Sequence, residues 1–396
     1  MNFGNLKYLA IAMLLLIIVI GGVLSYYKIY KPSYSPTTPS DIKLCSNKTT
    51  GEGLRYSIIL NEGLSSVFYC WLRVPSTERG IAEEFVPCKP EDYWKISGKE
   101  KSYTDFISTY VKPKNVITVS LRSKEAFKFG VFELRTKLPI YANGPMLWFG
   151  FEADDLFAGG VVHFMWHTAQ RKLYAFAGDI ISRVEMDLTP IVGVSDFSTN
   201  YHVFKIVYRE GLALWYVDGS LRAMAILASG DTRNSAILYY ARPYAIGIVR
   251  DLPSAKLPIL IDIDAGDISK DYEWDIHPWG LRVFEGDPKT SILLDLYIEN
   301  TDMKWEGRIL RQGSKIVSAP FPGTLDTVII MFLSLGKGRL YIETYINGKW
   351  YTYKQIDVEG GVPYSYTIPD KNLLYRVVFE AQEDNVIIQQ AKIYMK

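Results

Sequence analysis

Residues 161–168 read VVHFMWHT, and this stretch places two of the chain's four histidines, His163 and His167, four positions apart among apolar neighbours. On a helix the two side chains would share a face one turn apart, as in zinc proteases, but the adjacent glutamate of those motifs is missing. The β-branched and aromatic residues favour a strand. On a strand the two histidines share a face but lie about 13 Å apart, too far to bind one zinc ion with bonds of about 2 Å. The stretch therefore predicts a β-strand without a shared metal ion.

The same pattern of short β-branched and aromatic runs, separated by Gly, Pro, Asn and Asp, fills most of the chain. Asp218-Gly219 and Asn347-Gly348 each stand between two such runs, which is typical of two-residue β-hairpin turns. The pattern predicts an all-β fold with two sandwiches. Residues 43–266 have the length of a large jelly roll, and residues 267–396 that of a second, smaller β-sandwich.

The N-terminal region differs from the rest, because no residue from Tyr8 to Tyr27 is charged. Twenty such residues in a helix rise about 30 Å, which is the thickness of a bilayer core. We expect residues 1–30 to form an uncleaved transmembrane anchor, and a cleaved signal peptide is the alternative. Residues 31–42 are rich in Pro, Ser and Thr and are predicted to form an extended stalk.

Several features beyond the stalk suggest that the bulk of the chain lies outside the cell. Asn47 begins a glycosylation triplet, although such triplets are common by chance. Cys45, Cys70 and Cys88 are close in sequence and suggest one disulfide with a leftover thiol, with three pairings possible. Three free thiols are the alternative. The sequence therefore predicts a single-pass cell-membrane protein with an extracellular body.

The composition limits the possible partners. Hydrophobic residues make up 48% of the 396 residues and aromatic residues 14%, enough for sizeable cores. The formal net charge is only +1, so the basic excess of nucleic-acid-binding proteins is missing and no nucleic-acid partner is expected. The 28 tyrosines and 9 tryptophans suit a sandwich core. They also suit sugar binding, because ring faces stack on the apolar faces of pyranose rings.

Three segments of the first predicted sandwich contain recognisable sequence motifs in a fixed order. They are 127–139 (FKFGVFELRTKLP), 143–152 (NGPMLWFGFE) and 201–223 (YHVFKIVYREGLALWYVDGSLRA). Together they resemble the laminarinase/glucanase family of glycoside hydrolases, family 16, which has a concanavalin A-like jelly roll. The matching positions are Gly130, Phe132, Glu133, Arg135, Lys137, Leu138, Pro139, Trp148, Tyr201, His202, Trp215, Tyr216, Val217, Asp218 and Gly219. The resemblance implies the jelly-roll fold for the first sandwich and does not extend to the C-terminal residues.

The chain departs from that family at the strand that would carry catalysis. The family places Glu-x-Asp-x-Glu or Glu-x-Asp-x-x-Glu there, because retaining hydrolysis needs two carboxyl groups about 5–5.5 Å apart. In this chain Val161 stands at the first glutamate, His163 at the aspartate, and Met165 or Trp166 at the last glutamate. We therefore expect no catalytic residues at these positions.

If the resemblance holds, the same face of this strand lines a groove that could hold sugar without cutting it. The predicted ligand-binding residues are Trp148, Glu152, His163, Met165 and His167. Both histidines could instead be ordinary, partly buried residues.

The acidic group Glu152, Asp154 and Asp155 leaves three alternatives open: a solvated loop, a structural calcium site, or a relocated catalytic pair. No other cofactor is expected.

These observations favour a membrane-anchored extracellular protein that binds polysaccharide or glycoprotein glycans through a degenerate, non-catalytic glucanase-like domain. Two alternatives remain. One is an active glycoside hydrolase with relocated carboxylates. The other is a structural envelope or appendage protein that packs against other envelope proteins.

Overall fold

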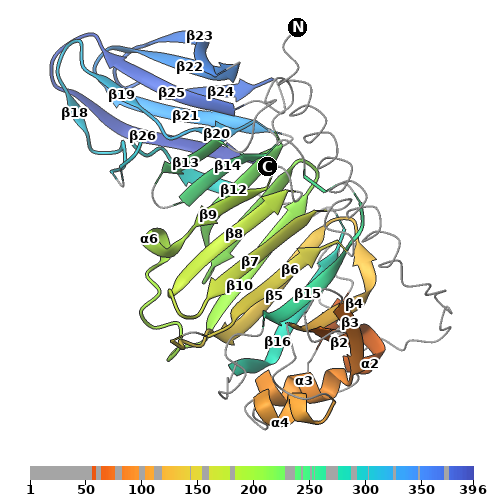
Figure 1. The fold of residues 1–396 in the computed structure, drawn as a ribbon. Helices are drawn as coiled ribbons and strands as arrows, with labels where there is room; N and C mark the ends of the chain where they lie inside the picture. The colour runs from red at the N-terminus through yellow and green to blue at the C-terminus, as the bar shows by residue number, and fades with distance from the viewer. Residues whose placement is uncertain are drawn as a thin grey trace, which may run out of the picture. The chain divides into compact units, whose positions relative to one another are not determined.

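Strands account for most of the structure, a computed structural model in which two β-sandwiches follow one another along the chain (Figure 1). The structure describes residues 56–58, 64–75, 83–97, 103–110, 118–142, 144–153, 160–178, 183–227, 237–241, 244–249, 252–253, 255–264, 275–286, 292–301, 303–323, 327–346, 348–369 and 374–396. The expectation of an all-β sandwich architecture is confirmed for these residues.

Two eight-stranded sheets form the first sandwich. One, the β5 sheet, has the order β1 (Tyr56–Ile58), β16 (Asp275–Glu285), β5 (Gly130–Lys137), β10 (His202–Arg209), β11 (Leu212–Val217), β12 (Ser220–Leu227), β14 (Tyr244–Val249) and β13 (Ile237–Ala241). The other, the β7 sheet, has the order β3 (Glu83–Cys88), β2 (Phe68–Pro75), β4 (Thr118–Phe127), β15 (Leu257–Asp264), β6 (Met146–Glu152), β7 (Val161–His167), β8 (Lys172–Gly178) and β9 (Val184–Asp187). Strand β16 continues the first sandwich to Glu285, beyond residue 266, at which the sequence analysis divides the two regions.

Four short helices accompany these sheets in the described part of the chain. They are α2 (Leu64–Val67), α3 (Pro90–Ser97), α4 (Tyr103–Ser108) and α6 (Thr189–Val192). No helix in the described ranges is long and apolar enough to cross a membrane. The predicted anchor and stalk lie outside those ranges.

Alternating side chains build the core of the first sandwich. On β5 every second residue is buried, so that Phe132 and Leu134 face inward. Phe149 of the β7 sheet lies 6.4 Å from Phe132 and 5.5 Å from Phe204 of β10, measured between ring centroids. One hydrogen bond also crosses the interior, from the indole Nε1 of Trp215 to the carbonyl oxygen of His163, at 3.1 Å. The apolar faces of both sheets therefore meet in one hydrophobic core.

Both predicted hairpins are present. Val217 pairs with Ser220 around Asp218-Gly219, and both turn residues have positive φ, 51° and 76°. Ile346 pairs with Lys349 around the second turn, in which Gly348 has φ of 80°.

The second sandwich begins after β16. One of its sheets, the β21 sheet, has the order β17 (Ile292–Asp295), β26 (Val386–Met395), β21 (Val328–Leu335) and β24 (Tyr364–Ile368), and β18 (Ile309–Leu310) also pairs with β26. The other, the β22 sheet, has the order β19 (Lys315–Val317), β25 (Leu374–Ala381), β22 (Gly338–Ile346) and β23 (Lys349–Val358), and β20 (Phe321–Pro322) also pairs with β25. Buried rings such as Trp305, Phe332 and Phe379 belong to its hydrophobic core.

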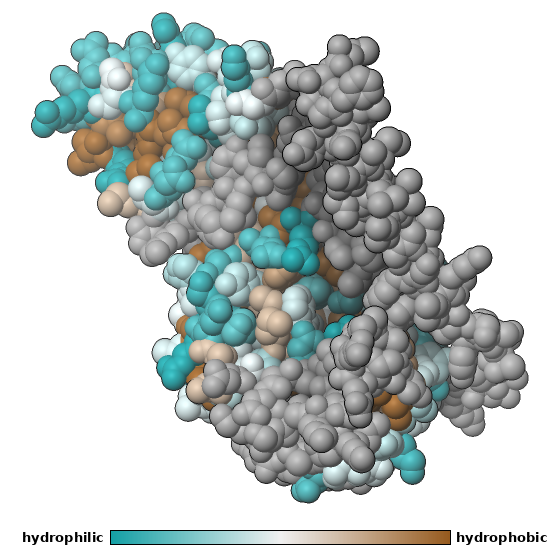
Figure 2. Space-filling view, viewed as in Figure 1, coloured by the Kyte–Doolittle hydropathy of each residue, from teal (hydrophilic) through white to brown (hydrophobic). Residues whose placement is uncertain are grey.

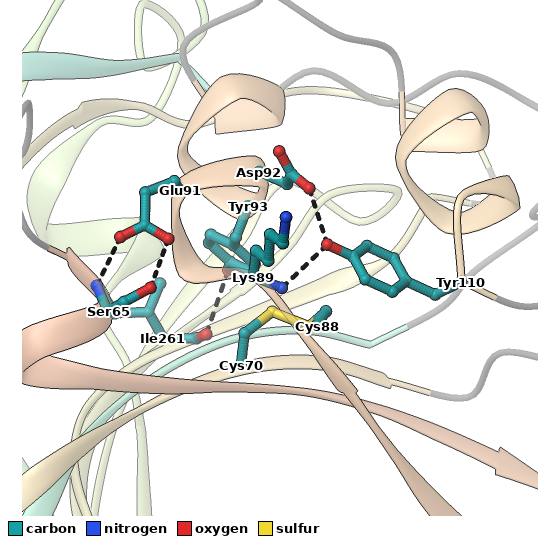
Figure 3. Close-up of a disulfide and its surroundings, with 9 residues drawn as sticks. All are labelled: Ser65, Cys70, Cys88, Lys89, Glu91, Asp92, Tyr93, Tyr110 and Ile261. Carbon is teal, nitrogen blue, oxygen red and sulfur yellow. Dashed lines mark hydrogen bonds between the residues drawn. A yellow bond between two sulfur atoms is a disulfide. The ribbon is translucent and has the colours of Figure 1, made fainter.

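A disulfide joins Cys70 to Cys88, which are direct partners in the antiparallel pairing of β2 with β3 (Figure 3). Hydrogen bonds tie the neighbouring helix α3 to the same region. The backbone N–H of Ser65 donates to Glu91 at 2.7 Å, and the hydroxyl of Tyr93 donates to the carbonyl oxygen of Ile261 at 3.1 Å. The structure thus contains one of the three pairings that the sequence leaves open, and Cys45 lies outside the described residues.

Replacing both Cys70 and Cys88 with Ala should lower the free energy of unfolding by about 3 kcal/mol, because the bond closes a loop of 18 residues in the unfolded chain. Chemical denaturation under oxidising conditions measures this loss. Cys45→Ala serves as the control and should leave the unfolding midpoint unchanged. A loss in the control as large as that in the double variant would contradict the assignment.

Candidate functional site

The two faces of β7 have different surroundings. Val162, Phe164 and Trp166 point into the core of the first sandwich. Val161 and Met165 lie on the opposite face and form a separate small apolar cluster with Phe176 of β8. We call this opposite face of strands β4, β15, β6, β7 and β8 the outer face of the β7 sheet.

Aromatic rings gather at the middle of the outer face. The ring of Trp148 on β6 lies edge-on to His163 at 4.9 Å and to Phe176 at 5.5 Å. Tyr174 lies 6.1 Å from Phe176. His163 and Phe176 are each only 3% exposed, whereas Trp148 and Tyr174 are half-buried. The accessible aromatic surface of this cluster thus comes from Trp148 and Tyr174.

Gly150 allows these groups to come together. It pairs with His163 across β6 and β7, and its φ is 148°. A Cβ atom at this position would lie 2.7 Å from the carbonyl oxygen of Val162 and 2.7 Å from the Cα of His163. Because both of these are backbone atoms, only glycine fits without moving the strand.

Glu152, at the end of β6, connects an arginine with the buried histidine. Its Oε1 lies 3.7 Å from Nη2 of Arg122 on β4, and its Oε2 lies 3.3 Å from Nδ1 of His163. The contact with His163 has ion-pair distance but not hydrogen-bond geometry. The carboxylate therefore holds a position between two potential cations.

Two further carboxyl groups, Asp262 and Asp264, enter the same face from β15. The indole Nε1 of Trp148 donates to Oδ2 of Asp264 at 2.8 Å, and the hydroxyl of Thr118 donates to Oδ1 at 2.9 Å. Asp264 thereby fixes the orientation of the Trp148 ring. Asp262 pairs with Trp148 in the strand register on one side and with Ser120 on the other.

Burial raises the pKa of both aspartates. For Asp262 desolvation is the largest cause, and the negative charge of Glu152 adds to it, so that its pKa lies well above the ordinary range. For Asp264 desolvation also outweighs the hydrogen bonds from Trp148 and Thr118, and its pKa is raised. Both aspartates of β15 thus hold a proton more readily than an exposed aspartate does.

Two side chains of this face, His163 and Asp262, have buried polar atoms without a hydrogen-bond partner. Nε2 of His163 and Oδ1 of Asp262 are both shielded from solvent and unpaired within the part of the chain that the structure describes. Unpaired buried polar atoms destabilise a protein unless a partner is supplied.

The structure brings together four of the five predicted binding residues: Trp148, Glu152, His163 and Met165. His167 shares their face, but its Nδ1 accepts a hydrogen bond from the backbone N–H of Gln170 at 3.2 Å. It therefore caps the turn between β7 and β8. Asn47, Asp154 and Asp155 lie outside the described residues.

Sequence reasoning did not find Asp262, Asp264 or Arg122. The segment "ILIDID" at residues 259–264 alternates apolar and acidic residues, which places both aspartates on the face opposite the core. That alternation was the available signal. The two aspartates belong to the site only because β15 lies next to β6, a strand more than one hundred residues away in sequence.

Metal binding finds no support among the described residues. They contain no group of three or more His, Cys, Asp or Glu side chains placed to hold an ion. Asp262 and Asp264 instead contact Ser120, Thr118 and Trp148.

The other family-like motifs stabilise the β5 sheet. Glu133 on β5 pairs with Lys205 on β10 at 3.3 Å. Nδ1 of His202 lies 2.7 Å from Oδ2 of Asp218, whose Oδ1 accepts the backbone N–H of Val203 at 2.9 Å. The Tyr-His and Asp-Gly motifs therefore fasten a hairpin to its neighbouring strand.

Comparison with known proteins gives structural similarity only. No protein-family model matches the chain, and no curated protein sequence matches it. The Bacillus licheniformis beta-glucanase is 15% identical, with 42% of this chain and 71% of that chain covered and a TM-score of 0.27. The laminarinase catalytic domain of Thermotoga maritima, in complex with cetyltrimethylammonium bromide, is 16% identical, with 56% and 77% covered and a TM-score of 0.29. The Crh5 transglycosylase in complex with NAG is 14% identical, with 45% and 76% covered and a TM-score of 0.30.

Replacing Asp262 with Asn should stabilise the protein at neutral pH. Its raised folded-state pKa means that the folded protein loses stability as the pH rises from the unfolded value of about 3.9 through the folded value. The variant should therefore match the wild type near pH 4 and exceed its Tm at pH 7, by about 2–4 °C for each kcal/mol recovered.

Thermal unfolding at a series of pH values measures this difference. Asp357→Asn is the control, since that carboxylate is 77% exposed and should change the pH profile little. A wild type and an Asp262→Asn variant with parallel profiles from pH 4 to pH 8 would contradict the buried position of Asp262.

Proposed function

We propose that the outer face of the β7 sheet binds polysaccharide without cleaving it. One observation carries the proposal: the same face contains the half-buried ring of Trp148 and two buried polar atoms that lack partners. These atoms are Nε2 of His163 and Oδ1 of Asp262. Apolar faces of sugar rings stack on aromatic rings, and sugar hydroxyl groups both donate and accept hydrogen bonds. A sugar ring that stacks on Trp148 would bring its hydroxyl groups next to this part of the outer face.

The charges of the site also suit a sugar ligand. Glu152 is close to Arg122 and His163, and the carboxylate of Asp264 is influenced by the charge of Arg73. Carboxylates and guanidinium groups that are already oriented by each other can form further hydrogen bonds with hydroxyl groups at fixed angles. The absence of a carboxylate at Val161, His163 and Met165 supports binding in preference to cleavage.

The proposal includes a location. A body held outside the cell by the N-terminal segment would reach wall or surface glycans, and the Cys70–Cys88 disulfide is compatible with an oxidising compartment. A hydrophobic segment of 20 residues and a Pro-rich stalk support anchoring in a membrane.

Trp148→Ala should weaken glycan binding about tenfold or more, which corresponds to a loss of about 1.4 kcal/mol or more. The full chain is titrated with laminarin-type and other cell-surface polysaccharides, and Kd is measured for each. Tyr351→Ala, which removes a half-exposed ring from the second sandwich, is the matched control and should bind as the wild type does. Equal affinities for wild type and Trp148→Ala would contradict the proposed site, and absence of all glycan binding would favour a scaffold function.

Hydrolysis is a second candidate function, because Asp262 and Glu152 are two carboxyl groups on the same face of the sheet. The pKa of Asp262 is raised, and Glu152 lies 3.7 Å from Arg122. Glycoside hydrolases use one carboxyl group as an acid and a second as a base or nucleophile. Release of reducing sugar by the wild type, lost in both Glu152→Gln and Asp262→Asn, would replace the non-catalytic proposal. Binding with no release from any polysaccharide tested would exclude this candidate.

A further inference from the structure

Strand β2 extends the outer face of the β7 sheet by one strand beyond β4. Cys70 and Leu72 of this strand are buried in the core of the first sandwich, so Trp71 between them points to the outer face. Its ring is half-buried and lies 6.0 Å from the ring of Tyr69. The outer face therefore carries Trp71 as well as Trp148.

The strand register places these two tryptophans in one line across the strands. Trp71 pairs with Ser120 on β4, and Ser120 pairs with Asp262 on β15. Asp262 pairs in turn with Trp148 on β6. Directly paired residues lie side by side on the same face of a sheet. Three strand spacings, or about 14 Å, thus separate the backbone positions of the two tryptophans.

The line continues on the other side of Trp148. Met165 on β7 pairs with Trp148, and Tyr174 on β8 pairs with Met165. Tyr174 is half-buried, so a third accessible ring follows after two further strand spacings, or about 10 Å. We call these six positions the cross-strand row: Trp71, Ser120, Asp262, Trp148, Met165 and Tyr174.

The two intervals between the rings differ in polarity. Ser120 and Asp262 occupy the interval between Trp71 and Trp148, and a hydrogen bond joins their side chains. Met165 occupies the interval between Trp148 and Tyr174. A ligand along the row would therefore meet hydrogen-bonding groups in one interval and an apolar side chain in the other.

The accessible rings follow the direction across the strands more than the direction along them. On β6 the outer-face neighbours of Trp148 are Met146 and Gly150, and neither has a ring. On β8 the ring next to the row, that of Phe176, is only 3% exposed. Tyr69 on β2 is the exception. An extended ligand that stacks on several rings would thus cross the strands.

The surface of the first sandwich is mixed in polarity on the side that Figure 2 shows. Hydrophilic, white and tan side chains alternate over it, whereas a larger brown patch lies on the second sandwich. Tryptophan and tyrosine combine an apolar ring with a polar group, so rings set among polar side chains belong to such a mixed surface. A sugar chain has the same combination of apolar ring faces and polar edges.

We propose that the cross-strand row holds one linear polysaccharide chain across the strands, with Trp71 as a second stacking position. The inference rests on the glycan-binding function proposed above and adds the length and direction of the ligand. A sugar unit of an extended chain advances by a length close to one strand spacing, so the row covers about six units. Rings that hold successive parts of one chain reinforce each other, because the first contact raises the effective concentration of the rest. The site therefore prefers long chains to short ones.

Titration of the full chain with linear β-1,3- and β-1,4-linked glucose oligosaccharides of two to about eight units tests the proposal. The affinity should rise with length and level off at about six units. Trp71→Ala should weaken binding of the longest oligosaccharides about tenfold, because it removes one stacking contact. It should leave the affinity for the shortest oligosaccharide that the wild type binds unchanged. Trp71→Phe retains a ring and should restore most of the lost affinity, and thermal unfolding at the wild-type Tm checks that Trp71→Ala is folded.

Phe85→Ala is the matched control. Phe85 is 48% exposed on the edge strand of the same sheet but pairs with Arg73, outside the row, so its replacement should leave every affinity unchanged. Affinity that does not depend on length would overturn the inference. So would a Trp71→Ala variant that binds long oligosaccharides as the wild type does, or a Phe85→Ala variant that is weakened to the same extent as Trp71→Ala.

The variant Trp148→Ala separates this inference from the proposed function. If Trp148→Ala weakens binding while length and Trp71 have no effect, the glycan-binding function stands and the cross-strand row is wrong. A wild type that binds no oligosaccharide and no polysaccharide overturns both.

Discussion

The two-residue period of a β-strand is the constraint on which the arrangement of β7 depends. Because successive side chains point to opposite faces, the strand must supply Val162, Phe164 and Trp166 to the core and Val161, His163 and Met165 to the outer face. A shift of register by one residue would bury His167 and expose Trp166. The hydrogen bond from Trp215 to the carbonyl oxygen of His163 fixes the register from the other sheet, because it joins a buried indole to one particular residue of β7.

Packing on one face therefore determines geometry on the other. Gly150 leaves room for the backbone of His163 on β7, and the ring of Trp148 lies 4.9 Å from the His163 ring. Asp264, two strand positions beyond Asp262, orients the same indole ring from the neighbouring strand. The outer face is held by groups on rigid strands, and its aromatic and acidic side chains are positioned before any ligand arrives.

Much of this architecture could be predicted from the sequence. Alternation gave the strand character of β7 and the shared face of His163 and Met165, and the two Gly-containing turns gave both hairpins. Asp262 could not be recognised as part of the site, because its partners come from β4 and β6, which are distant in sequence and adjacent only in the sheet.

The Cys70–Cys88 disulfide lies at the edge of the sheet that carries the candidate site. The edge strand, β3, contains Pro87 and begins with two glutamates, and both features discourage further strands from pairing with an open edge. The next strand inward, β2, reads FYCWLRVP and begins with five residues that carry no charge and no proline. If the crosslink were reduced and β3 detached, β2 would become a template for aggregation. The disulfide thus adds a covalent link to the strand pairing that keeps β3 over β2.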